Sequence, residues 1–139
     1  MNASTPLEWN DHICAGRQYL KAAGNGLSRP AVFTNELIYH LTAMAVEKLL
    51  VGLFQYHCRM PADHTLDGLV DELSLLCLLD RRLADDIKAL GRFDDMCPLV
   101  PVQRSIPTDQ EVQGILEVGR QVAAFVEQEI YHRLPQKAV

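Results

Sequence analysis

One Arg-His pair in the chain has a spacing that suits acid-base chemistry on RNA. His64 follows Arg59 by five positions, in a short Pro-containing segment between two expected helices. Histidine titrates near neutral pH and can move a proton, and arginine can stabilise the charge of a phosphoryl transition state. The pair is therefore a candidate ribonuclease couple. Its place at a joint between helices fits an architectural role for His64 equally well, such as capping or bridging to a neighbouring helix.

Two other sets of residues have types that bind metals. Glu129 and His132 form a Glu-x-x-His step, but a di-iron bundle needs two such steps and further carboxylates, so we expect structural ion pairing here. Four acids lie close in sequence: Asp85, Asp86, Asp94 and Asp95. We interpret them as a solvated acidic edge, because clustered charges usually face water. The sequence therefore predicts no metal site and no cofactor.

Glu47 and Lys48 are charged residues on a helix that is otherwise apolar. Because buried charges need partners, we expect this pair at a seam between two copies of the chain or between two helices, with ligand contact as the alternative. Arg92, beside a long loop, is a further candidate for contact with a ligand phosphate or a partner.

The spacing of apolar residues predicts five helices and no strand. The expected helices cover about Trp9–Ala23, Ala31–His57, Leu66–Cys77, Arg81–Leu90 and a last helix that starts after Thr108. Gly24 and Gly26 are expected to end the first helix in left-handed caps. Three prolines mark residues 92–107 as a long loop.

The second and last helices have the clearest signals. The second is apolar over most of its circumference, including Leu37 and Met44, so it should run through the middle of the bundle. Thr108 and Glu111 form a capping box at the start of the last helix. We expect one domain over residues 1–139, folded as an all-α, antiparallel up-and-down bundle of about five helices.

Composition narrows the class of protein. The formal net charge of -5 gives no general nucleic-acid-binding surface. Four widely spaced cysteines, Cys14, Cys58, Cys77 and Cys97, show no zinc-knuckle or redox spacing, and we expect them reduced. The start of the chain does not resemble a secretory signal, and no apolar run approaches the ~18 residues of a membrane span. We therefore expect a cytoplasmic protein without membrane contact.

Several stretches resemble the HEPN family, the higher eukaryotes and prokaryotes nucleotide-binding domain. "LIYHLTAMAVEKLLVGLF" is similar to the family's second helix with its Ala-x-Glu-Lys-like box, matched by Ala45, Glu47 and Lys48. "MPADHTLDGLVDEL" resembles the Pro-to-His-x-Leu entry into the third helix, and "GRFDD" resembles an Arg-Tyr segment with Phe93 in place of Tyr. The resemblance spans about residues 7 to 133.

The resemblance implies a small helical bundle that is often a homodimer and is found beside nucleotidyltransferases or in toxin-antitoxin pairs. Many members are metal-independent ribonucleases whose Arg and His lie four to six residues apart near the start of the last helix. Here that helix has Arg120 without a following His at this interval. The family's catalytic motif is therefore absent from its usual place.

We expect a non-catalytic HEPN-like module that acts by homodimerisation and by association with a nucleotide- or nucleic-acid-handling partner, such as a nucleotidyltransferase or an antitoxin. One alternative is a ribonuclease toxin that uses Arg59 and His64 on RNA. Another is a small nucleotide-binding module with a pocket beneath the long loop, where Arg92 and Phe93 would contact the ligand.

Overall fold

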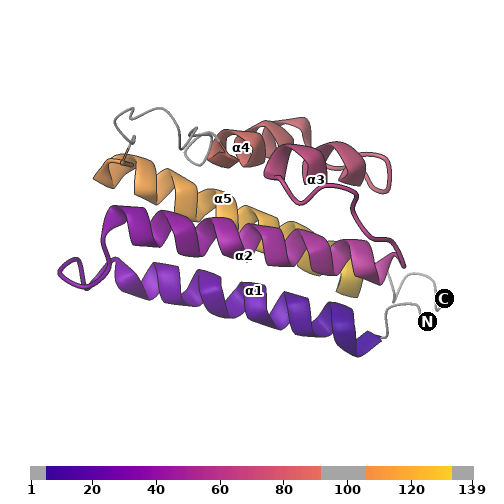
Figure 1. The fold of residues 1–139 in the computed structure, drawn as a ribbon, viewed down its shortest axis with the longest axis horizontal. Coiled ribbons are helices and arrows are strands. Elements are labelled where there is room, and N and C mark those ends of the chain that lie inside the picture. The colour runs from indigo at the N-terminus through magenta and orange to yellow at the C-terminus, as the bar shows by residue number, and fades with distance from the viewer. Residues whose placement is uncertain (1–5, 92–105, 133–139) are drawn as a thin grey trace.

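The regular elements of the protein are all helical in the stretches that the structure describes, residues 6–91 and 106–132 of a computed structural model (Figure 1). They are α1 (Pro6–Gly26), α2 (Asn35–Tyr56), α3 (Leu66–Leu73), α4 (Arg81–Gly91), α5 (Asp109–Glu127) and a π-helical turn, η1 (Gln128–His132). The predicted five-helix, all-α bundle is confirmed.

The three long helices form the body of the bundle, and α3 and α4 form a hairpin laid over one side of it (Figure 1). α1 runs opposite to α2, since Trp9 near the start of α1 meets Tyr56 at the end of α2 with 5.4 Å between ring centroids. α2 and α5 begin at the same end of the bundle. There the Asn35 side-chain amide donates a hydrogen bond to Asp109 Oδ1 at 2.8 Å.

α2 is the central helix, as its apolar circumference predicts. It packs against α1, α5 and α3, and its buried residues include Tyr39, Leu49, Leu50, Leu53 and Phe54. By length and composition α2 could cross a membrane, which corrects the expectation that no segment reaches that limit. However, 61% of its most apolar stretch is buried inside the protein, as in the core helix of a soluble protein.

Side-chain caps fix where three helices begin. The hydroxyl oxygens of Thr34, Thr65 and Thr108 each accept a hydrogen bond, at 3.1 Å, from the backbone N–H three residues later. At α5 the Glu111 carboxylate also accepts from the Thr108 N–H at 2.9 Å, so the predicted capping box is confirmed. These caps satisfy N–H groups that a helix start leaves without partners.

The expected left-handed caps at Gly24 and Gly26 are wrong. α1 continues through Gly26, and no glycine in the described part of the chain has a positive φ. Gly26 is needed for space, because a Cβ at this position would lie 2.6 Å from the ring of Phe33. The residues after Gly26 form turns, so α2 starts at Asn35 and not at about Ala31.

α3 is shorter than the apolar spacing predicts. It ends at Leu73, and residues 74–77 continue as turns in which the Cys77 N–H donates to the Leu73 carbonyl at 3.1 Å. The large side chains of Leu75 and Leu78 are 85% and 95% exposed. The predicted loop at 92–107 lies outside the described residues except for its last two positions, and so do Asp94, Asp95 and Cys97.

Candidate functional site

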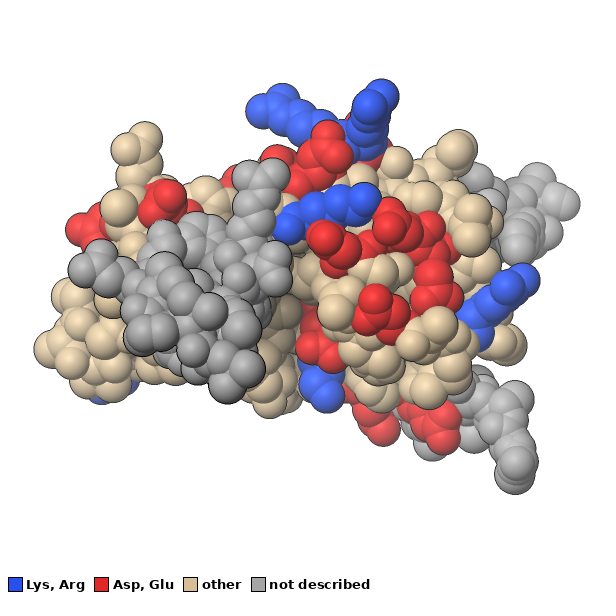
Figure 2. Space-filling view, turned by 45° about the horizontal axis from the view of Figure 1, so that its top comes forward, with Lys and Arg blue, Asp and Glu red and all other residues tan. Residues whose placement is uncertain are grey.

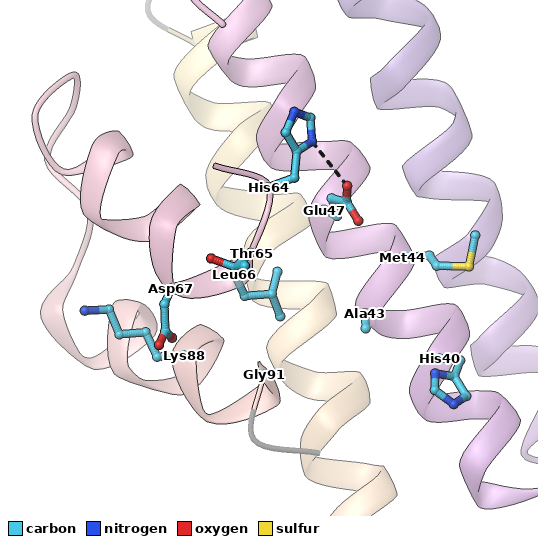
Figure 3. A pocket seen from close by; sticks show the side chains of 10 residues that line it. All are labelled: His40, Ala43, Met44, Glu47, His64, Thr65, Leu66, Asp67, Lys88 and Gly91. Carbon is cyan, nitrogen blue, oxygen red and sulfur yellow. Dashed lines mark hydrogen bonds and ion pairs between the residues drawn. The ribbon is translucent and has the colours of Figure 1, made fainter. Parts of the chain in front are cut away.

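A concave site lies between α2 and the α3–α4 hairpin. It is a cleft of about 710 Å³. Its walls are shown in Figure 3 and consist of His40, Ala43, Met44 and Glu47 from α2, His64, Thr65, Leu66 and Asp67 at the entry to α3, and Lys88 and Gly91 from α4. The Tyr39 hydroxyl holds the two sides together by donating a buried hydrogen bond to the Leu90 carbonyl at 2.7 Å.

Glu47 and His64 face each other across the cleft. His64 Nδ1 lies 3.4 Å from Glu47 Oε2, and the side chains are 54% and 43% exposed for His64 and Glu47 (Figure 3). At this exposure an ion pair between the protonated imidazole and the carboxylate stabilises the fold by at most about 1 kcal/mol. Glu47 is therefore accessible to a partner or a ligand, and its nearest charged neighbour comes from another element of the same chain.

A tight turn holds His64 in place. The Asp63 carboxylate accepts hydrogen bonds from the Thr65 N–H at 2.8 Å and from the Thr65 hydroxyl at 3.0 Å. These two bonds stabilise the charged form and lower the pKa of Asp63 below its ordinary value. The backbone on both sides of His64 is therefore fixed, while its imidazole remains open to solvent. This is consistent with the architectural role considered for this residue.

Lys88 forms the opposite wall and is paired with an acid. Its ammonium lies 2.8 Å from Asp71 Oδ1, and this hydrogen bond is the main cause that raises the pKa of Lys88 above its ordinary value. The α3–α4 side of the molecule is acidic overall, as Figure 2 shows. The acids of α3 and α4 are Asp67, Asp71, Glu72, Asp85 and Asp86. Arg81, Arg82 and Lys88 of α4 offset part of this charge, so the two helices keep only a small excess of acids.

Arg59 does not lie with His64 in the cleft. It follows α2 directly, is exposed, and is not among the described residues that line the cleft. Among the described residues no hydrogen bond joins its side chain to His64. A ribonuclease couple requires both side chains at one phosphate-sized site. Only the histidine of the candidate pair lies at the cleft, and catalysis by the pair remains a prediction.

The other residues predicted to contact a ligand or a partner are Lys48, Arg92 and Phe93. Lys48 is partly buried on α2 and does not line the cleft. Arg92 and Phe93 lie outside the described residues.

Sequence reasoning missed the exposed apolar side chains beside the cleft. Leu37 and Met44, which the apolar pattern of α2 places in its buried set, are 38% and 42% exposed. They are seven positions apart, so they lie on one face of the helix two turns from each other. An α2 that is apolar all round gives no signal of which face is left open, because that depends on where the other helices pack.

Searches against protein-family models, curated proteins and solved structures give no significant match to this chain.

Proposed function

We propose that this protein is a non-catalytic HEPN-like helical module in the cytoplasm that acts by association. It forms a homodimer through the outer face of α2 and associates with a partner that handles nucleotides or nucleic acid, of the nucleotidyltransferase or antitoxin type. The observation that carries the proposal is the exposed apolar face of the central helix, marked by Leu37 and Met44. The family expectation rests on the resemblance of α2 and of the entry into α3.

The exposed face suits a symmetric contact between two copies. A helix that is apolar around its circumference normally has neighbours on every side, but in the described part of the chain Leu37, His40 and Met44 of α2 are exposed, the last two at the wall of the cleft. If two α2 helices pack antiparallel about a twofold axis near His40, Leu37 of each copy meets Met44 of the other. The exposed apolar area is small, so we expect a dissociation constant on the order of micromolar.

The dimer is tested by analytical ultracentrifugation over a concentration series. Met44→Glu and Leu37→Glu should each raise the dissociation constant by at least ~10-fold, because each places two charges in the proposed contact. The matched control is Val32→Glu, since Val32 is 58% exposed in the turn before α2 and lies outside the face. A wild-type monomer at all concentrations, or a Met44→Glu dimer of unchanged affinity, would contradict the proposal.

The proposal that the protein does not cleave RNA is tested separately. We expect the purified protein to leave single-stranded RNA intact in the presence of a chelator, because Arg59 does not join His64 at the cleft. Cleavage that disappears in both Arg59→Ala and His64→Ala would favour the ribonuclease alternative. Thermal stabilisation by a mononucleotide, lost in Lys88→Ala, would favour the nucleotide-binding alternative.

A further inference from the structure

Three side chains that are far apart in sequence lie together at the end of the bundle opposite the α2–α5 start. They are His57 after α2, Cys77 after α3 and Glu129 in η1, and one potential ligand atom of each lies within 4.8 Å of the other two. All three are partly buried. We propose that this His-Cys-Glu cluster is a binding site for a zinc-like divalent metal ion, which would tie α2, the α3–α4 hairpin and the end of α5 together.

The main chain places His57 firmly. It is the C-cap of α2, which ends in a Schellman arrangement: the Cys58 N–H donates to the Gln55 carbonyl and the Arg59 N–H donates to the Phe54 carbonyl, both at 2.9 Å. Cys58 therefore has a φ of 60°, in the left-handed region that favours glycine. His57 is therefore held at the end of α2 by a common helix-ending pattern of hydrogen bonds.

The other two ligands are placed by irregular segments. Cys77 lies in the turns after α3, and its thiol lies 3.7 Å from the Leu73 carbonyl oxygen, to which it donates a weak hydrogen bond. Glu129 lies in the π-helical turn that continues α5. Single π-helical turns within α-helices are frequent at functional sites. Cys77 belongs to no sequence motif, and Glu129 belongs only to the Glu-x-x-His step with His132.

The ligand types favour zinc. Zn²⁺ accepts thiolate, imidazole and carboxylate ligands, and catalytic zinc sites commonly combine three protein ligands with one open position. Bond lengths of about 2.0 to 2.3 Å place neighbouring ligand atoms of a tetrahedral site about 3.3 to 3.7 Å apart. The present upper limit of 4.8 Å requires an inward movement of about 1 Å by one or two side chains, which a rotation about a side-chain bond supplies.

The site also has an entry path. Cys77 and Glu129 line a surface pocket of about 450 Å³, whose other walls are Ser74, Leu75, Leu76 and Leu78. A metal ion can reach the cluster through this pocket, and its fourth coordination position would face it. The exposed Leu75 and Leu78 surround this opening with apolar surface.

Cobalt replaces zinc in the first test, because Co²⁺ bound to a thiolate gives a charge-transfer band and its d–d bands report tetrahedral geometry. The full-length protein is freed of metal with a chelator under reducing conditions and titrated with Co²⁺, then with Zn²⁺. We expect one equivalent of Co²⁺ with a thiolate band that Zn²⁺ displaces. Zn²⁺ at 100 times its dissociation constant should raise the Tm by roughly 10 °C. A spectrum without a thiolate band would overturn the proposal.

Variants assign the ligands. Cys77→Ser should remove the charge-transfer band, and Glu129→Gln and His57→Gln should weaken Zn²⁺ binding at least ~10-fold. Cys58→Ser and Cys14→Ser are matched controls, because each replaces one exposed cysteine by serine. Both variants should bind Zn²⁺ with the affinity of the wild type. Circular dichroism confirms that each variant is folded. A thiolate band that persists in Cys77→Ser would overturn the assignment.

A third measurement, the rate of cysteine alkylation, uses only the wild-type protein and so does not depend on whether a variant folds. Alkylation of each cysteine in the wild-type protein is followed by peptide mass spectrometry with and without Zn²⁺. Zn²⁺ should slow modification of Cys77 by at least ~10-fold and leave Cys14 unchanged, because a metal-bound thiolate is a poorer nucleophile and is shielded. Equal protection of both cysteines, or of neither, would contradict the site.

Discussion

Cys58 occupies a backbone position that most side chains avoid. It has the only positive φ among the described non-glycine residues, at 60°, and it is the residue that turns the chain out of α2. In this region a Cβ lies too close to the following carbonyl oxygen, which costs roughly 1–2 kcal/mol for an ordinary residue. The free energy of unfolding is therefore lowered by a side chain at this position.

Cys58→Gly should increase the free energy of unfolding by about 1 kcal/mol, because glycine adopts this conformation without a steric cost. The effect is measured by urea denaturation under reducing conditions. Cys58→Ala is the matched control, since it removes the thiol but keeps the Cβ, and it should give no such increase. A gain in Cys58→Ala equal to that in Cys58→Gly would show that the thiol and not the backbone is the cause.

At the scale of single residues, His64 shows that spacing along the sequence does not determine which side chains meet. The five-residue step from Arg59 predicts a chemical couple, but only His64 lines the cleft. His64 instead lies 3.4 Å from the carboxylate of Glu47, which precedes it by 17 positions on α2. Spacing within a loop does not fix which side chains meet, because the loop can turn between them.

At the scale of the helix, α5 contains one glycine in open space, Gly114, and one in a crowded position, Gly119. The two can therefore be compared as a matched pair. A Cβ on Gly114 would meet nothing within 4 Å, whereas a Cβ on Gly119 would lie 2.8 Å from Leu20 Cδ1 and 2.9 Å from Thr42 Cγ2. Thr42 is fully buried, and its hydroxyl donates to the Ile38 carbonyl at 2.9 Å, so it cannot rotate without losing this bond. Gly119 therefore permits the close approach of α1, α2 and α5.

Gly114→Ala should stabilise the protein by about 0.5–1 kcal/mol, because alanine restricts the unfolded chain and favours the helix. Gly119→Ala should destabilise it by about 1–3 kcal/mol through overpacking. Both are measured by thermal and urea unfolding. Because the substitution and the helix are the same, a similar effect of both variants would contradict the proposed role of Gly119 in packing.

Across the whole molecule, the burial of the helices is unequal. α2 has twelve buried residues along its length, and α3 has three in a helix of eight residues. The turns that connect α3 to α4 also carry exposed leucines. Local opening is easiest where few apolar contacts must break. The α3–α4 hairpin is therefore expected to open before the middle of α2 becomes exposed.

Hydrogen exchange tests this order. Amides in the middle of α2 should exchange only through global unfolding, and those of α3 should exchange through a smaller opening with lower free energy. Exchange is followed by mass spectrometry at peptide resolution, with α5 as an internal reference. Equal protection of α2 and α3 across denaturant concentrations would mean that the hairpin and the long helices unfold as one unit.

By itself the sequence determined the class of fold and much of the local structure. The 3.6-residue period and the capping box at Thr108 depend on neighbours in the chain, and both are present. The sequence did not predict the ends of α1 and α3 correctly: α1 continues through Gly24 and Gly26, and α3 ends at Leu73. For the glycines the reason is that helix packing decides whether a glycine supplies a turn or space.

Only the tertiary structure decided which side chains meet and which apolar face stays open. His57, Cys77 and Glu129 come from three elements, and no spacing along the chain predicts that they converge. Likewise, Leu37 and Met44 look like core residues in the sequence, whereas both side chains are exposed in the described part of the structure. The physical reason is that periodicity records the amphipathic character of each helix, whereas contacts between helices depend on their packing in three dimensions.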